Sequence, residues 1–254
     1  MKTLFVIMLI TVYLFPIKTG HNRSSVIKDQ PLIKQVPVLV YHHISRKSVK
    51  ANLLFISEKN FAMQMKELYD SGYHAILPNQ LISAYRPGVA LPAKPVMISF
   101  DDAHLEQFTL AVPILKQYGF KAVFFVMTVT LDKRGFLSSA QLSALVQQGH
   151  ITGAHTWDHP NLKHQLPAQW YRQLVPPKIK LESITGKPVD CFAYPYGAWQ
   201  ESLLPEIHKV GYITAFQLTG KSSSGYPLLT IRRIMVNGAW SPTTLISQMN
   251  EGFQ

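Results

Sequence analysis

The segment that decides the fold, residues 96–126, reads VMISFDDAHLEQFTLAVPILKQYGFKAVFFV. It begins and ends with short apolar runs, residues 96–100 and 122–126, which have the length and composition of buried strands. Between them, residues 106–118 have the pattern of an amphipathic helix, and Gly119 follows where helices commonly end. The segment therefore predicts two parallel strands joined by a helix.

The same alternation extends in both directions along the chain. Further strands are expected at residues 37–41, 74–77, 151–154, 192–194, 213–216 and 230–236, and further helices at 57–71, 138–148, 167–185 and 201–210. A glycine follows each helix, as at Gly72 and Gly186. This order predicts an α/β protein in which helices cover a parallel sheet, and seven or eight units suit a barrel. An open doubly wound sheet is the alternative.

The N-terminus has the layout of an export signal. Lys2 precedes an apolar stretch over residues 4–16, and the chain turns polar at Lys18, so residues 1–20 are expected to be a signal peptide or an N-terminal anchor. Residues 21–35 are interpreted as a linker, and residues 36–254 as one domain. The protein is therefore expected to be secreted, periplasmic or membrane-anchored. With Cys191 as the only cysteine, the domain must be held together by packing rather than by an internal disulfide.

The charge indicates an anionic environment. The formal net charge is +11, and without residues 1–20 the chain keeps 23 basic and 14 acidic residues, a net charge of +9. This favours association with a cell wall or a membrane surface. Nucleic acid would suit the same charge, but export and the scattered basic residues argue against it. No glycine-rich phosphate loop follows a strand, which disfavours nucleotide chemistry.

Candidate ligands for a metal follow two of the expected strands. Residues 96–100 lead directly into Asp101 and Asp102, and residues 151–154 lead into His155, with His159 four positions later. Pro160 disfavours a helix at His159, so the two imidazoles are expected on a loop. Carboxyl ends of parallel strands meet at one edge of the sheet, where a carboxylate and two imidazoles can bind one ion.

Two further strand ends add groups that could act on a substrate. The turn Pro195-Tyr196-Gly197 could aim the backbone N–H of Tyr196 at a developing oxyanion, although an ordinary aromatic turn would have the same sequence. In Tyr41-His42-His43, at the end of the first strand, a histidine could protonate a leaving amine.

Together these motifs identify a family resemblance over residues 36–240. Ser-Phe-Asp-Asp at 99–102, Gly-x-His-Thr-x-x-His at 153–159 and Pro-Tyr-Gly at 195–197 resemble, in order and spacing, three motifs of the carbohydrate esterase family 4 (NodB-homology) polysaccharide deacetylases. The opening Val-Leu-Val-Tyr-His-His-Ile at 38–44 resembles the branch that includes the poly-N-acetylglucosamine deacetylases. The resemblance implies the distorted (β/α)7–8 barrel of that family.

The resemblance also implies a role for each residue at the metal. Asp101 would be the general base, and Asp102, His155 and His159 would hold a divalent ion, most often Zn²⁺, with Co²⁺, Ni²⁺ or Fe²⁺ as alternatives. The nucleophile would be a metal-bound water. Thr156 is expected to support the ligand loop.

The remaining implied roles concern the acid and the oxyanion. His42 would protonate the leaving amine rather than His43, whose side chain should point to the opposite face of the strand. The N–H of Tyr196, in the turn that begins at Pro195, would stabilise the oxyanion.

The sequence departs from the family pattern at three places. Ala103 replaces the glycine usual after the paired aspartates, and Ala193 replaces the arginine that usually orients the base. Arg233 is the expected substitute from another strand, with Arg232 facing away. The family's C-terminal Leu-x-x-His motif is missing, which is consistent with His42 as the acid.

The predicted function is metal-dependent N-deacetylation of an N-acetylglucosamine-containing polysaccharide, such as an exopolysaccharide, peptidoglycan or a chitin-like chain. Two alternatives are an O-acetyl glycan esterase and a non-catalytic glycan-binding module on the same fold. The other histidines, among them His74, His104 and His150, are expected to face solvent or to form local hydrogen bonds only.

Overall fold

The computed structural model describes residues 35–47, 50–85 and 87–253. The predicted export segment, residues 1–20, and nearly all of the predicted linker lie outside this part of the chain. Within it, no helix combines the length and the apolar character needed to cross a membrane.

A parallel sheet forms the centre of the domain, and its main path runs in the order β10, β1, β5, β6, β7, β8, β9. A short strand, β4 (His74–Ala75), pairs with the start of β5, and β2 (His43–Ser45) and β3 (Phe55–Ser57) form a separate parallel pair. The strands of the main path are β1 (Val38–Tyr41), β5 (Pro95–Phe100), β6 (Val123–Val126), β7 (Ile151–Ala154), β8 (Cys191–Ala193), β9 (Thr214–Phe216) and β10 (Ile234–Met235).

The segment before β10 brings the two edges of this sheet together. Ile231 forms a parallel bridge to Phe216 at the end of β9, and its N–H donates to the carbonyl of Ala215 at 3.0 Å. Three residues later, Ile234 pairs with Leu39 of β1. One short segment thus contacts both edge strands, and the sheet curls into the predicted distorted barrel rather than an open doubly wound sheet.

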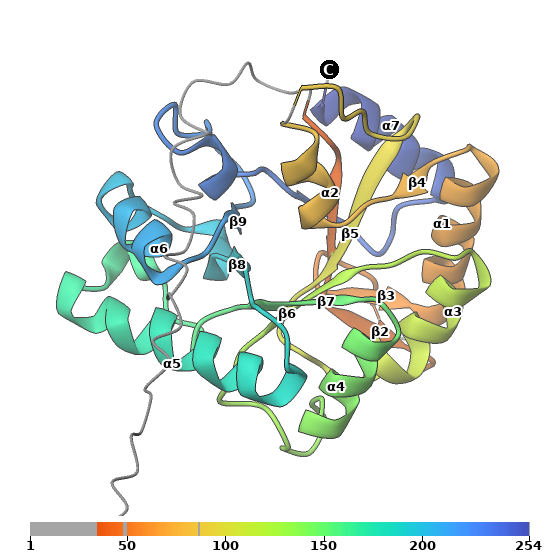
Figure 1. Ribbon diagram of the computed structural model, residues 1–254. Coiled ribbons are helices and arrows are strands. Elements are labelled where there is room, and N and C mark those ends of the chain that lie inside the picture. Colours follow the sequence, from red (N-terminus) through yellow and green to blue (C-terminus); the bar gives the residue numbers. More distant parts are fainter. Residues whose placement is uncertain (1–34, 48–49, 86, 254) are drawn as a thin grey trace, which may run out of the picture. The chain divides into compact units, whose positions relative to one another are not determined.

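Helices cover the outside of the sheet, as Figure 1 shows. In chain order they are α1 (Glu58–Asp70), α2 (Pro78–Ser83), α3 (Val112–Gln117), α4 (Ser139–Gln147), α5 (Pro167–Thr185), α6 (Leu204–Val210) and α7 (Pro242–Gly252). The π-helical turn η2 (Gln107–Ala111) precedes α3, and single 3₁₀ turns are η3 (Leu162–His164), η4 (Pro195–Gly197), η5 (Glu201–Leu203) and η6 (Pro227–Leu229). Neighbouring helices pack in the series α7, α1, α3 and in the series α4, α5, α6.

The predicted helix ends agree with the structure, whereas two predicted helices are divided, one of which, at residues 201–210, forms η5 and α6. Every glycine expected after a helix has a positive φ, for example 75° at Gly72 and 65° at Gly186. The helix expected at residues 106–118 is divided into η2 and α3. Pro113 lies at the junction, where it has no N–H to continue the regular hydrogen-bond ladder.

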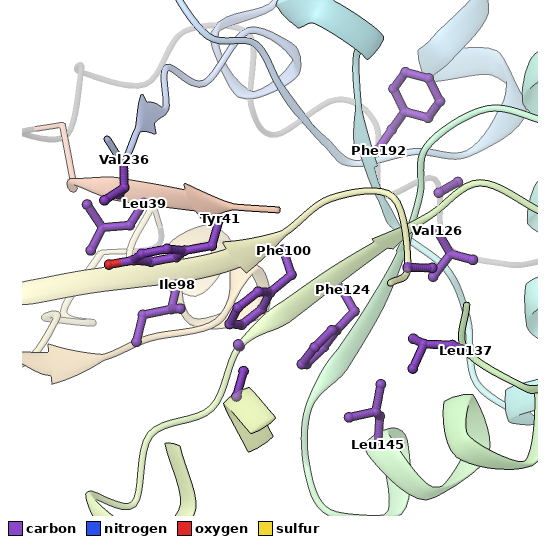
Figure 2. Close-up of a cluster of buried hydrophobic side chains, with 14 of the residues drawn as sticks. Leu39, Tyr41, Ile98, Phe100, Phe124, Val126, Leu137, Leu145, Phe192 and Val236 are labelled. Atoms are coloured by element: carbon purple, nitrogen blue, oxygen red, sulfur yellow. The ribbon is translucent and has the colours of Figure 1, made fainter. Parts of the chain in front are cut away.

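Successive strand residues alternate between two buried layers. Side chains on the outer face of the sheet pack against the helices, as the cluster in Figure 2 shows for Leu39, Ile98, Phe124 and Leu145. The intervening residues fill a smaller cluster inside the barrel, which contains Val38, Met97, Val123, Phe125, Cys191 and Phe216. Because strand side chains alternate with a period of two, this pattern also decides which residues at the strand ends point inward.

Candidate active site

The barrel alternation directs several of the predicted site residues to one place. Asp101 lies four positions after the inward-facing Met97, and His42 four positions after the inward-facing Val38. Both follow the carboxyl ends of their strands, β5 and β1, which are neighbours in the sheet. His155 follows β7 in the same way. A parallel sheet therefore gathers these groups at one rim of the barrel.

Asp101 is buried and forms a two-pronged ion pair with Arg233. Nη1 and Nη2 of the guanidinium each donate to one carboxylate oxygen, both at 2.7 Å. Burial opposes ionisation of Asp101, but the charges of Arg233 and His155 hold its pKa below the usual range. Arg233 thus contacts the carboxylate of Asp101, which the arginine usual at position 193 of the family motif would orient. Arg232 faces away and donates to the carbonyl of Gly252 at 2.7 Å.

Asp102 lies between the two predicted histidine ligands. Its Oδ1 atom is 3.6 Å from Nε2 of His155 and 3.6 Å from Nε2 of His159. These distances are too long for hydrogen bonds, and Oδ1 is buried without a hydrogen-bond partner among the described residues. Ligand atoms around one tetrahedral zinc ion are about 3.3 Å apart, given metal–ligand bonds of about 2.0–2.1 Å. The three donors therefore fit a single divalent ion.

Backbone and hydroxyl contacts orient both imidazoles. Nδ1 of His155 donates to the carbonyl of Ala193 at 2.8 Å, which leaves Nε2 free to face Asp102. The backbone N–H of His159 donates to Oγ1 of Thr156 at 2.9 Å. Burial, with His155 nearby, lowers the pKa of His159 to about 4, so its imidazole is neutral at pH 7, as a ligand must be.

The loops that hold these groups have unusual backbone conformations. Positive φ angles occur at seven non-glycine residues of the described chain, and five of these are Asp102, Ala103, Thr156, His159 and Tyr196. Such conformations cost free energy and persist only where the surrounding structure imposes them. Ala103 has a φ of 63°, which explains physically why a glycine is usual at that position of the motif.

His42 faces the same group of charges from β1. Burial lowers the pKa of its imidazole, and the carboxylates of Asp101 and Asp102 oppose this effect. Its Nδ1 atom is buried with no hydrogen-bond partner in the part of the chain that the structure describes. His43, the first residue of β2, has a different partner: its Nδ1 is 2.7 Å from Oε1 of Glu106.

The third motif places an aromatic side chain beside the ligands. Pro195 is buried, whereas 63% of Tyr196 is exposed and its ring lies edge-on to His159, 4.7 Å between centroids. Gly197 allows the following turn to pass against Leu218, because a Cβ atom there would lie 2.5 Å from the backbone nitrogen of Leu218. The turn therefore contributes to the wall of the same rim.

Two polar residues at the site were not found by the sequence motifs. Gln107, fully buried in η2, donates from Nε2 to the backbone carbonyls of His42 and Asp101, and so ties the ends of β1 and β5 together. His104 was expected to face solvent or to form local contacts only. Its approach to Asp102, with Nε2 3.6 Å from Oδ2, is such a local contact, but its ring also packs on His43, which was not expected. The Gln107 hydrogen bonds and the His43 contact do not follow from spacing, because they depend on how β1 and β5 are paired.

Comparisons with known proteins identify the family of this chain. Residues 88–215 match the polysaccharide deacetylase family. The chain is 28% identical over 225 residues to YxkH of Bacillus subtilis, provisionally named a polysaccharide deacetylase, and the match covers 88% of this chain and 79% of that protein. It is 24% identical over 254 residues to the poly-beta-1,6-N-acetyl-D-glucosamine N-deacetylase of Staphylococcus aureus, covering 87% of each.

A solved deacetylase structure is also similar to this chain. The deacetylase PplD of Streptococcus pyogenes, in complex with acetate, superimposes with a TM-score of 0.77 at 25% identity, covering 85% of this chain and 98% of PplD. The segment that matches the family, residues 88–215, extends from β5 into β9 and contains the loops of all three motifs. The chain belongs to the polysaccharide deacetylase family of hydrolases.

Proposed function

We propose that this protein uses a divalent metal ion, with Zn²⁺ as the first candidate, to remove N-acetyl groups from a polysaccharide that contains N-acetylglucosamine. The observation that carries the proposal is the buried Oδ1 atom of Asp102, which lies 3.6 Å from both His155 Nε2 and His159 Nε2. The ionised pair of Asp101 and Arg233 lies beside it, since Asp101 Oδ2 is 3.7 Å from His155 Nε2.

Each protein group has a distinct task in this proposal. A bound divalent ion would polarise the acetyl carbonyl and a water molecule. Asp101, kept ionised by Arg233, accepts the proton of the attacking water. His42 delivers a proton to the nitrogen that leaves as an amine. The backbone N–H of Tyr196 stabilises the negative charge on the former carbonyl oxygen.

The polymer and the location of the reaction are further proposals. The named activity of the Staphylococcus aureus relative favours an N-acetylglucosamine polymer. The export pattern of residues 1–20, which lie outside the described residues, supports action outside the cytoplasm. The net charge of +9 beyond this segment would favour an anionic cell wall or membrane surface.

The proposal is tested by metal analysis combined with acetate release from matched N-acetylated and O-acetylated glycans. We expect about one equivalent of bound metal, and acetate release from the N-acetylated substrates that stops after chelation and returns when Zn²⁺ is added. The variant His155→Ala should lose both metal and activity, whereas Asp101→Asn should keep the metal and lose activity. His164→Ala, on an exposed histidine of η3, is the control.

Three outcomes would contradict the proposal. Full activity in metal-free protein would exclude the role of Asp102, His155 and His159. Release of acetate only from O-acetylated glycans would identify an esterase, and glycan binding without any acetate release would identify a binding module.

A further inference from the structure

The carboxylate of Asp102 has a second neighbour on its other oxygen. Oδ1 faces His155 and His159, whereas Oδ2 is 3.6 Å from Nε2 of His104. This distance is slightly longer than a hydrogen bond, and a small rotation of either side chain would close it. We propose that His104 is a positioning residue, which holds the Asp102 carboxylate in the orientation that presents Oδ1 to the metal. The inference rests on the proposed function, in which Asp102 is a ligand.

His104 is itself held in place by two aromatic rings. Its ring packs on His43 at an interplanar angle of 30°, with centroids 3.6 Å apart, and stacks on Phe136, with centroids 5.1 Å apart. The backbone of His104 also forms an antiparallel bridge with Phe136. A side chain fixed by its neighbours can orient a ligand without losing rotational freedom when the metal binds.

His43 extends this support to the start of η2. Its ring lies parallel to Phe55, with centroids 4.4 Å apart and an interplanar angle of 4°, and its Nδ1 is 2.7 Å from Oε1 of Glu106. The contacts form a continuous series from Glu106 through His43 and His104 to Asp102.

A second metal ion is a poorer explanation of the same cluster. Potential donor atoms of His43, His104 and Glu106 do lie within 4.8 Å of one another. However, the lone pairs of an imidazole lie in the plane of its ring, and the two rings are stacked with planes only 30° apart. Lone pairs in such planes do not converge on one ion about 2.1 Å from both nitrogens. The cluster therefore serves the carboxylate of Asp102.

The test measures zinc affinity of the purified protein by competition with a chromophoric chelator. His104→Phe keeps a ring in the stack and removes the N–H, and we expect it to weaken zinc binding by about 10- to 100-fold. His104→Gln returns an N–H at similar reach and should recover most of the loss. The midpoint of urea unfolding of the metal-free protein reports whether each variant is folded. His164→Phe, at an exposed position, is the matched control and should bind zinc as the wild type does.

Four further results complete the test. Asp102→Ala should abolish zinc binding. If Asp102→Ala loses zinc but His104→Phe binds zinc like the wild type, the positioning role of His104 is wrong while the proposed metal site stands. If the wild type binds no zinc, or Asp102→Ala leaves binding unchanged, the proposed function itself fails and the inference with it. If His104→Phe does not fold, His43→Phe takes its place, and a loss of at least several-fold in affinity is required. A second zinc equivalent that His43→Phe removes would overturn the positioning role.

Discussion

Replacing Arg233 with methionine tests the central ion pair, because it removes the charge and keeps a side chain of similar length. Arg233 and Asp101 are only 4% and 3% exposed, and the pair is joined by two hydrogen bonds of 2.7 Å. Breaking one partner of a buried pair typically costs about 3–5 kcal/mol, since the other charge remains buried and unpaired. We expect Arg233→Met to lower the free energy of unfolding by about 3–4 kcal/mol at pH 7.

The upper limit of this loss can be worked out from the carboxyl group. Asp101 in the variant can take up a proton instead of remaining charged, and from its ordinary pKa of 3.8 this costs about 4 kcal/mol at pH 7, at 1.36 kcal/mol per pH unit. The same protonation costs only about 1.6 kcal/mol at pH 5. The destabilisation should therefore shrink by up to about 1.4 kcal/mol for each unit by which the pH is lowered.

The sign of this dependence follows from proton linkage. In the wild type the pKa of Asp101 is depressed, so its contribution to stability is present above the unfolded pKa and is lost only as the pH falls through the lower folded value. In Arg233→Met burial raises the folded pKa, so the folded variant binds an extra proton and loses stability as the pH rises. Subtracting the free energies of unfolding of the two proteins at each pH removes the titration of groups that the substitution does not affect.

The assay is urea unfolding of metal-free protein at pH 5, 6 and 7, so that metal binding does not enter the result. Arg232→Met is the matched control, since it removes one hydrogen bond to Gly252 and should cost about 1 kcal/mol without a pH slope. The double variant Asp101→Asn, Arg233→Met should be more stable at pH 7 than Arg233→Met alone. A pH-independent loss below about 1 kcal/mol in Arg233→Met would show that the buried ion pair does not stabilise the fold in this way.

Two other predictions concern stability away from the ion pair. Burial lowers the pKa of His150 from 6.5 to about 4, and the Nδ1 atom of His150 accepts a hydrogen bond from the N–H of Ala122. The folded protein therefore keeps this ring neutral, and the stability of the protein should fall as the pH is lowered from 6.5 to 4. His150→Phe should flatten that part of the pH profile, by at most about 3 kcal/mol, in urea unfolding; an unchanged slope would contradict this. Gly197 and Gly186 share a φ of 65°, but only at Gly197 would the Cβ of an alanine lie 2.5 Å from Leu218. In thermal unfolding, Gly197→Ala should therefore lose about 1–3 kcal/mol more stability than Gly186→Ala, and equal losses would exclude the contact.

Local pattern was enough to predict the elements that build the barrel. The two apolar runs at residues 96–100 and 122–126 correspond to β5 and β6, and the range predicted for α5 is the observed one. The pattern missed β2, β3, α2 and α7, which are short or flanked by polar turns. It also did not predict that Pro113 separates a π-helical turn from α3. Short elements depend more on tertiary packing than on their own sequence.

Sequence pattern alone was sufficient to place the chemical groups at the rim. Parallel strands end at one edge of a sheet, so the groups that follow β5 and β7, Asp101, Asp102 and His155, were expected at the same rim. How these groups are held depends on the tertiary structure. Arg233 is separated by 132 positions from Asp101 and reaches it because residues 231–235 contact both edges of the sheet. His104 approaches Asp102 Oδ2 from a stack of rings contributed by separate segments, and such contacts depend on barrel closure and packing, which no local pattern specifies.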